Sequence, residues 1–270
     1  MKKILFVIPS YEMGGTTSSV INLIDLLQGK CRFDLLVMAH EGPRRAFFAE
    51  QKVLPEKRLL AAMVGNFGNH EHATQLLISA PLKLLRRACL GLGVDIAGYV
   101  YGAVAETIRR QDYYAVVAWQ EGEATRFVAR IRNCKRMAWV RCDYRRVVKR
   151  KRDVGVYQKM SRIVCVSEYT RQSFCQCLPE VAHRVETIYN PIDVQRIVNA
   201  GAEIDLDARF TDGQFNILSI GRYSAVKRFD VIQVSSVACE ALDAGFGGIY
   251  WGSRSARFIV GYWTIFEGLE

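Results

Sequence analysis

The sequence of 270 residues lacks an apolar run long enough to span a bilayer. Its apolar start, "MKKILFVIPS", is short, stops at Pro9 and is followed by no small-residue cleavage site, which argues against a signal peptide. We therefore interpret this stretch as a buried first strand and expect a cytoplasmic protein. The length is enough for two modest domains.

Paired cysteines are also missing. The eight cysteines are scattered and none forms a C-x-x-C pair. Cys175 and Cys177 stand two residues apart on an expected helix, so their sulfurs would lie on different faces. We expect reduced cysteines that pack as small hydrophobic residues, with no disulfide framework and no zinc site.

Acidic residues are outnumbered by basic ones, 27 against 37, which gives a formal net charge of +10. Such an excess favours anionic partners, which include nucleic acid, acidic lipid and phosphorylated ligands. Composition does not choose among them. No nucleic-acid motif accompanies the charge, so we expect no nucleic-acid partner.

Apolar strands alternate with helical patterns, which predicts a parallel sheet. The fold class is α/β: a Rossmann-like sheet with helices on both faces over residues 1–190, a linker at 191–214, and an incomplete second α/β domain at 215–270. After residue 230 the pattern allows at most two further strands. Strands are expected at 2–9, 31–40, 113–120, 136–143, 162–168, 184–190 and 215–221, and helices at 18–27, 73–110 (broken near 91–93), 123–133, 155–161 and 169–178.

A glycine pair, Gly14 and Gly15, follows the first strand and precedes a helix. Glycines let the backbone approach a ligand closely, and a helix start offers free N–H groups to an anion. The third glycine of the G-x-G-x-x-G pattern is absent, so a nicotinamide dinucleotide site is unsupported. A plain strand-to-helix turn with a Ser or Thr N-cap is the alternative interpretation.

Two cations, Arg222 and Lys227, follow the strand at 215–221. Fixed cations at the carboxyl end of a strand can hold a diphosphate and neutralise a phosphate leaving group. Two solvated cations on a surface loop are the alternative interpretation.

Carboxylates and an arginine stand at two other strand ends. Glu121 and Glu123 occur in "QEGEAT" and could contact substrate hydroxyls, or could be favourable charges in the first turn of a helix. Arg141 and Asp143 occur in "AWVRCDY", where a surface ion pair is the alternative.

Six cations occur within eight residues, in the run "RRVVKRKR". We call Arg145, Arg146, Lys149, Arg150, Lys151 and Arg152 the basic run. Its density favours contact with an anionic surface such as phospholipid or a lipid-linked phosphate. A solvated face is the alternative.

In this order, the segments "VIPSYEMGG", "QEGEAT", "MAWVRCDY", "VCVSEYTRQSF", "IYNPID" and "ILSIGRYSAVKRFD" resemble bacterial family-four glycosyltransferases that build capsular, lipopolysaccharide or other surface polysaccharides. The resemblance covers residues 2–230. It implies the GT-B architecture and the transfer of a sugar, with retained anomeric configuration, from a nucleoside diphosphate to a glycan or lipid-linked acceptor. It implies no cofactor and no metal.

The resemblance also implies roles for single residues. Arg222 and Lys227 match the pair that holds the donor diphosphate, and the turn at Gly14 and Gly15 would approach the same phosphates. Glu121 and Arg141 would be the catalytic side chains on the acceptor side. The basic run would place the protein peripherally on the inner face of the cell membrane.

The sequence departs from the family twice. Relatives often carry His where this chain has Arg141, which is bulkier and permanently charged. After residue 230 the family pattern stops, and no E-G-x-x-x-x-x-E motif follows. We therefore hypothesise a truncated chain whose last segment is a frameshifted reading. An inactive remnant that binds only acceptor or membrane surface is the alternative function.

Overall fold

The computed structural model describes residues 1–12, 14–42, 44–64, 73–92, 94–202, 215–222, 231, 246–254 and 257–264. The chain divides into two units, Met1–Asp193 and Val194–Glu270, and each is described by itself.

A parallel sheet of seven strands forms the centre of the first unit, in the order β3-β2-β1-β4-β5-β6-β7. Successive strands lie outward from β1 in both directions, so strands that follow one another are joined by crossover segments on the faces of the sheet. The strands are β1 (Lys2–Ile8), β2 (Cys31–Val37), β3 (Lys52–Val53), β4 (Ala115–Ala118), β5 (Lys135–Val140), β6 (Arg162–Cys165) and β7 (Val185–Thr187).

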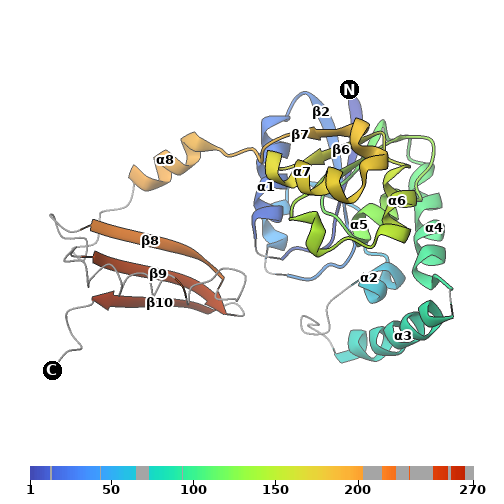
Figure 1. Ribbon diagram of the computed structural model, residues 1–270, viewed down its shortest axis with the longest axis horizontal. Helices are drawn as coiled ribbons and strands as arrows, with labels where there is room; N and C mark the ends of the chain where they lie inside the picture. The colour runs from blue at the N-terminus through green and yellow to red at the C-terminus, as the bar shows by residue number, and fades with distance from the viewer. Residues whose placement is uncertain are drawn as a thin grey trace. The chain divides into compact units, whose positions relative to one another are not determined.

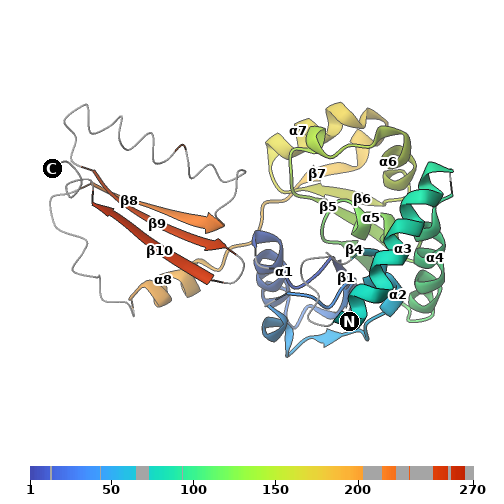
Figure 2. The same cartoon turned by 90° about the horizontal axis from the view of Figure 1, so that it is seen from below.

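Each face of this sheet has its own apolar core. Along β1, Leu5 and Val7 belong to one cluster of buried residues, whereas Phe6 and Ile8 belong to the other. This alternation is what a strand covered on both faces requires, and it explains the uninterrupted apolar run of β1. Figure 2 shows α1 on one side of the strands and α2, α3 and α4 on the other. The predicted fold class is confirmed.

The helices of the first unit follow the sequence pattern with a few differences. The expected helical region at 73–110 is two helices, as predicted from the break near 91–93. The short elements α2 and β3 were not predicted. The helices are α1 (Gly15–Leu26), α2 (Arg58–Val64), α3 (Ala73–Gly91), α4 (Ile96–Arg109), α5 (Glu123–Val128), α6 (Arg150–Tyr157) and α7 (Glu168–Cys177), with short 3₁₀ turns η1 (Arg45–Phe48), η2 (Tyr144–Arg146) and η3 (Pro179–Arg184).

Helix α6 begins inside the basic run, not at residue 155 as predicted. The reason is Asp153, which is buried. Its carboxylate accepts hydrogen bonds from the backbone N–H of Lys149 at 2.7 Å and from the Tyr144 hydroxyl at 2.9 Å. A buried acceptor that satisfies the N–H of the capping residue Lys149 favours a helix start at Arg150, five residues earlier than the apolar pattern indicates.

The second unit contains α8 (Val194–Ala202) and a three-stranded sheet in the order β10-β9-β8. Strand β8 (Phe215–Arg222) pairs in parallel with β9 (Phe246–Arg254), and β10 (Arg257–Thr264) pairs antiparallel with β9. In the described ranges after residue 230 the structure has the strands β9 and β10, which is within the predicted maximum of two. Helix α8 lies in the segment predicted to be a linker, and none of its side chains is buried.

The cysteines that the structure describes are free. Cys165 is buried in the core, and the partly buried Cys134 and Cys177 pack against the same cluster, as expected of small hydrophobic residues. Cys239 lies outside the described residues. No helix in the described ranges combines the length and apolarity needed to cross a bilayer.

Candidate functional site

Several of the predicted residues meet at the carboxyl ends of β1, β4 and β5. Gly14 precedes α1 with a φ of 155°, a conformation that side-chain-bearing residues rarely adopt. A Cβ atom added at Gly14 or Gly15 would meet no atom within 4 Å. The space beside this turn is therefore open, as a ligand-approaching loop requires.

Glu121 and Arg141 are in direct contact. The backbone N–H of Arg141 donates to Glu121 Oε2 at 2.8 Å, which joins the end of β5 to the loop after β4. Burial raises the pKa of the neighbouring Cys142 thiol to about 12, and the charge of Glu121 adds to the rise. The two residues predicted as catalytic are therefore in contact. The Glu121 carboxylate fixes the main chain of Arg141 by accepting its N–H.

The Arg141 guanidinium lies over the ring of Trp119, with its central carbon 4.4 Å from the ring centroid. Its Nε donates to the Trp119 carbonyl at 2.8 Å, and its Nη1 donates to Asn190 Oδ1 at 3.0 Å. Its Nη2 is buried and has no hydrogen-bond partner among the described residues. Burial lowers the pKa of Arg141 to about 10, although the charge of Glu121 opposes this.

Trp119 links the arginine to the glycine turn. Its indole N–H donates to the Thr16 carbonyl at 2.9 Å, in the first turn of α1. Its ring lies 4.8 Å from that of Trp139, centroid to centroid. Sequence reasoning did not identify Trp119, Asn190 or Thr16 as site residues. The only signal was that Trp119 and Asn190 each stand next to the end of a strand.

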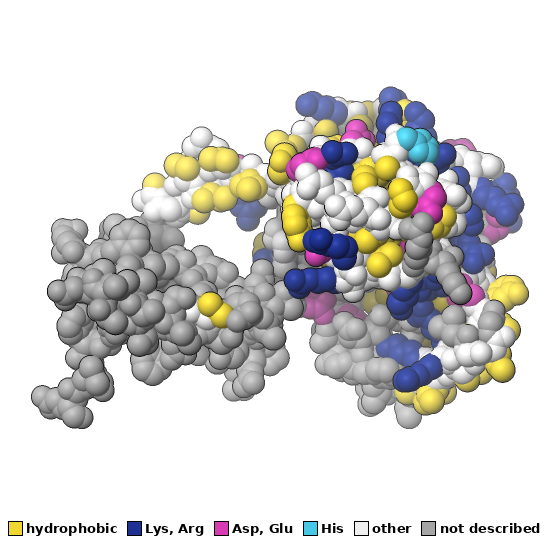
Figure 3. All heavy atoms as spheres, viewed as in Figure 1, with side chains coloured by type: hydrophobic (Ala, Val, Ile, Leu, Met, Phe, Trp, Pro, Cys, Tyr) yellow, Lys and Arg dark blue, Asp and Glu magenta, His cyan; other side chains and the backbone are white. Residues whose placement is uncertain are grey.

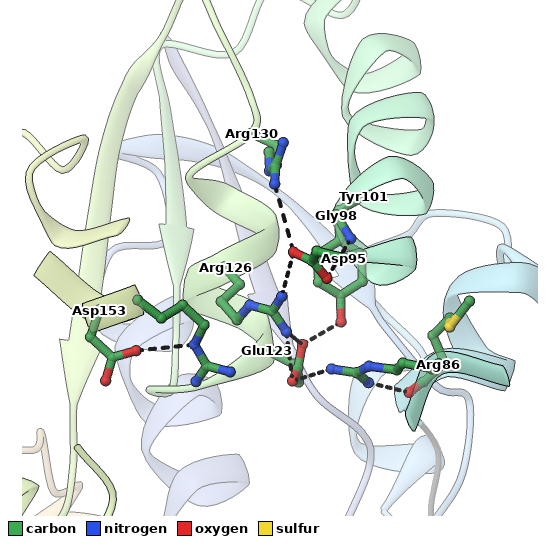
Figure 4. Close-up of polar contacts among 10 residues, drawn as sticks. Arg86, Asp95, Gly98, Tyr101, Glu123, Arg126, Arg130 and Asp153 are labelled. Carbon is green, nitrogen blue, oxygen red and sulfur yellow. Dashed lines mark hydrogen bonds and ion pairs between the residues drawn. The ribbon is translucent and has the colours of Figure 1, made fainter. Parts of the chain in front are cut away.

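The other carboxylates at these strand ends have different partners. Glu123 accepts hydrogen bonds from Arg86 in α3 and Tyr101 in α4, as Figure 4 shows. Asp143 does not pair with Arg141, so the surface ion pair considered for these two is absent. Instead Asp143 pairs with Arg145 at 2.9 Å and accepts a hydrogen bond from Ser173.

Glu123 is the centre of a network that joins α3, α4 and α5 (Figure 4). It pairs with Arg86 at 2.8 Å and with Arg126 at 2.9 Å, and it accepts a hydrogen bond from Tyr101. Arg126 also pairs with Asp95 at 2.8 Å. Burial tends to raise the pKa of Glu123, but the charges of Arg126 and Arg86 and the Tyr101 hydroxyl outweigh it, and the pKa lies below its usual value.

The basic run is partly neutralised by its neighbours. Arg145 and Arg146 both reach Asp143, and Arg152 pairs with Asp153 at 3.3 Å. The Arg146 side chain is nevertheless 78% exposed. The side chains of Arg150 and Lys151 lie outside the described part of the structure. Figure 3 shows Lys and Arg side chains spread over several elements of the first unit, with acidic side chains among them.

The predicted donor residues belong to the second unit. Arg222 is the last residue of β8, as predicted for the end of a strand, but its side chain lies outside the description. Lys227 also lies outside the described residues. Their proximity to the glycine turn stays a prediction.

No protein-family model and no curated protein matches the sequence. Among solved structures, the chain is similar to Anabaena Alr3699/HepE in complex with UDP and glucose, with a TM-score of 0.57 and 14% identity over 93% of this chain. It is also similar to a glycosyltransferase from Rickettsia africae, with a TM-score of 0.53 and 11% identity over 94% of this chain. The chain spans 61% of the length of each of these proteins. At such identities the similarity establishes a shared fold.

Proposed function

We propose that the chain is a glycosyltransferase of GT-B architecture that moves a sugar from a nucleoside diphosphate to a glycan or lipid-linked acceptor. The observation that carries this proposal is the fold shared with HepE, a protein whose structure contains UDP and glucose. The Rickettsia africae glycosyltransferase shares it as well. The ordered set of motifs from residue 2 to residue 230 supports the same conclusion.

The chemistry assigned to the first unit follows from the strand ends. Ligands of parallel α/β sheets bind beyond the carboxyl ends of the strands, where Gly14, Glu121 and Arg141 lie. The open glycine turn admits the donor phosphates, and the Arg141 guanidinium supplies a fixed positive charge beside the reacting sugar. Glu121 holds the main chain of Arg141 and thereby fixes where that charge lies.

The chemistry assigned to the second unit is donor binding. Arg222 and Lys227 hold the diphosphate and stabilise its negative charge as the sugar departs. In this proposal the transfer retains anomeric configuration, belongs to family four, needs no metal and serves the synthesis of a surface polysaccharide.

A thermal-unfolding experiment with UDP and with GDP tests donor binding. A ligand that binds only the folded protein stabilises it by about 2.7 kcal/mol at a concentration 100-fold above its dissociation constant. One of the two nucleotides should therefore raise Tm in the wild-type protein. The rise should be lost in Arg222→Gln and Lys227→Gln. It should persist in Arg132→Gln, which removes an exposed cation in the segment that enters β5 at its amino end.

No change in Tm with either nucleotide would contradict the proposal. The chain would then be better described as an inactive protein that binds acceptor or membrane surface. Transfer of labelled sugar from the stabilising nucleotide's sugar derivative to a bacterial lipid extract is the direct measurement of activity.

We also propose that the basic run contacts the anionic inner leaflet of the cell membrane. Arg146 supports this because most of its side chain is exposed despite the nearby Asp143. Co-sedimentation should be stronger with vesicles of phosphatidylcholine and phosphatidylglycerol than with phosphatidylcholine alone. Lys149→Gln should weaken it, whereas equal sedimentation with both vesicles would contradict the contact.

A further inference from the structure

Two arginines in the first unit differ in how their charge is compensated. The Arg126 side chain is 8% exposed and pairs with two carboxylates, those of Glu123 and Asp95 (Figure 4). Burial alone would lower the pKa of Arg126, but these two acids raise it above its ordinary value. Arg126 is thus a buried arginine whose charge is compensated by two carboxylates in direct contact with it.

Arg141 is compensated less, because the charge of Glu121 favours its charged form but burial outweighs that effect on the pKa. Its guanidinium donates only to neutral oxygens, the Trp119 carbonyl and Asn190 Oδ1. Among the described residues it forms no ion pair, and the buried Nη2 has no partner. The nearest carboxylate, that of Glu121, accepts from the backbone N–H of Arg141 instead of from the guanidinium. The charge is therefore held in place, and Glu121 offsets it only in part.

Holding a partly buried guanidinium without a carboxylate in direct contact with it is unfavourable. Removing a charged group from water costs several kcal/mol unless an opposite charge or strong hydrogen bonds replace the lost hydration. A neutral hydroxyl could accept from Nη2 but would leave the charge uncompensated. A carboxylate or phosphate would supply a hydrogen-bond acceptor for Nη2 and a negative charge at the same time. Its two oxygens match the planar fork of a guanidinium.

We propose that Arg141, lying over Trp119 and oriented by Asn190, binds a carboxylate or phosphate group carried by the sugar unit of an acidic acceptor. The inference rests on the proposed glycosyltransferase function and specifies its acceptor class. It assigns to Arg141 a role in acceptor selection. The arginine that replaces the family's histidine thereby changes which sugar the site prefers.

Binding measurements with three sugars test the proposal on the full chain. Isothermal titration at constant ionic strength compares glucuronate, glucose 6-phosphate and glucose. Hydrogen bonds to a charged group are strong enough that at least one anionic sugar should bind about tenfold or more tightly than glucose. Comparison of glucuronate with glucose 6-phosphate distinguishes a carboxylate from a phosphate.

Arg141→Gln should abolish the preference for the anionic sugar, and Arg141→Lys should retain part of it, because lysine keeps the charge but loses the planar fork. The matched control is Arg132→Gln, an exposed arginine that should leave the preference unchanged. Circular dichroism establishes that each variant is folded. If Arg141→Gln does not fold, the wild-type preference and the Arg141→Lys result still decide the question.

Equal affinity of the wild-type protein for all three sugars would overturn the proposal, as would an anion preference that survives in Arg141→Gln. A parallel titration with UDP keeps the two proposals separate. Binding of UDP without any anion preference would leave the glycosyltransferase proposal in place and remove the anionic acceptor. An anion preference that depends on Arg141 without binding of UDP or GDP would leave an anion site at Arg141 but would remove the glycosyltransferase proposal, and with it the role of that site in acceptor selection.

Discussion

Glu123→Gln should destabilise the first unit, because it removes the charge that pairs with both Arg86 and Arg126 in the network of Figure 4. Breaking a buried ion pair by removing one partner typically costs 3–5 kcal/mol. Two facts reduce that figure here. Arg126 keeps its pairing with Asp95, and the Glu123 side chain is 29% exposed. We expect a loss of about 2–3 kcal/mol at pH 7.

The pH dependence has a definite sign. The pKa of Glu123 is lowered in the folded state, so its contribution to stability is fully present above the unfolded value of about 4.3 and is lost as the pH falls through the folded value. The difference between wild type and Glu123→Gln should therefore be constant near neutral pH. It should shrink as the pH falls from about 4.3 downward.

Urea unfolding followed by circular dichroism between pH 7 and pH 3 measures both effects. Glu106→Gln is the matched control, because Glu106 lies on an exposed surface and pairs with Arg109 one turn away. That variant should unfold at the same urea concentration as the wild type. A loss below about 0.5 kcal/mol for Glu123→Gln, or a difference that persists unchanged to pH 3, would refute the reasoning.

Three further substitutions test local geometry by the same unfolding measurement. Gly42→Ala should cost at least about 2 kcal/mol, because Gly42 has a φ of +112° and its Cβ atom would lie 2.5 Å from the Tyr11 backbone; a near-neutral result would contradict that contact. Trp119→Phe keeps a ring under Arg141 but loses the indole N–H bond to the Thr16 carbonyl, so we expect a loss of about 1 kcal/mol, and no loss would exclude that link. Ser167→Ala removes the side chain that caps α7 by accepting the N–H three residues on, again at about 1 kcal/mol, and unchanged stability would mean that the cap contributes nothing.

The sheet could be predicted because buried parallel strands are apolar on both faces and therefore stand out as short hydrophobic runs. The element β3 could not, since it has two residues and pairs only with Asp34 and Leu35. Helix α6 was placed too late along the chain because counting cations does not reveal that Asp153 is buried beneath them.

From the sequence, the site residues could be assigned to the ends of particular strands, but their side-chain contacts could not be predicted. The family resemblance placed Glu121 and Arg141 together on the acceptor side, and the two residues are in contact. The contact between Trp119 and Thr16 joins residues 103 positions apart and depends on which way a ring is turned. A single sequence contains no pattern from which that orientation could be deduced.

The contact between the tilted rings of Trp119 and Trp139 has a practical consequence. Two of the four tryptophans of the chain lie in this pair, and one of them is directly beneath the Arg141 guanidinium. The emission of an indole responds to a cation held against its face and to any group that redistributes that charge. The protein thus contains a built-in optical reporter at the position where an acidic sugar would arrive, and occupancy could be followed by intrinsic fluorescence without attaching a dye.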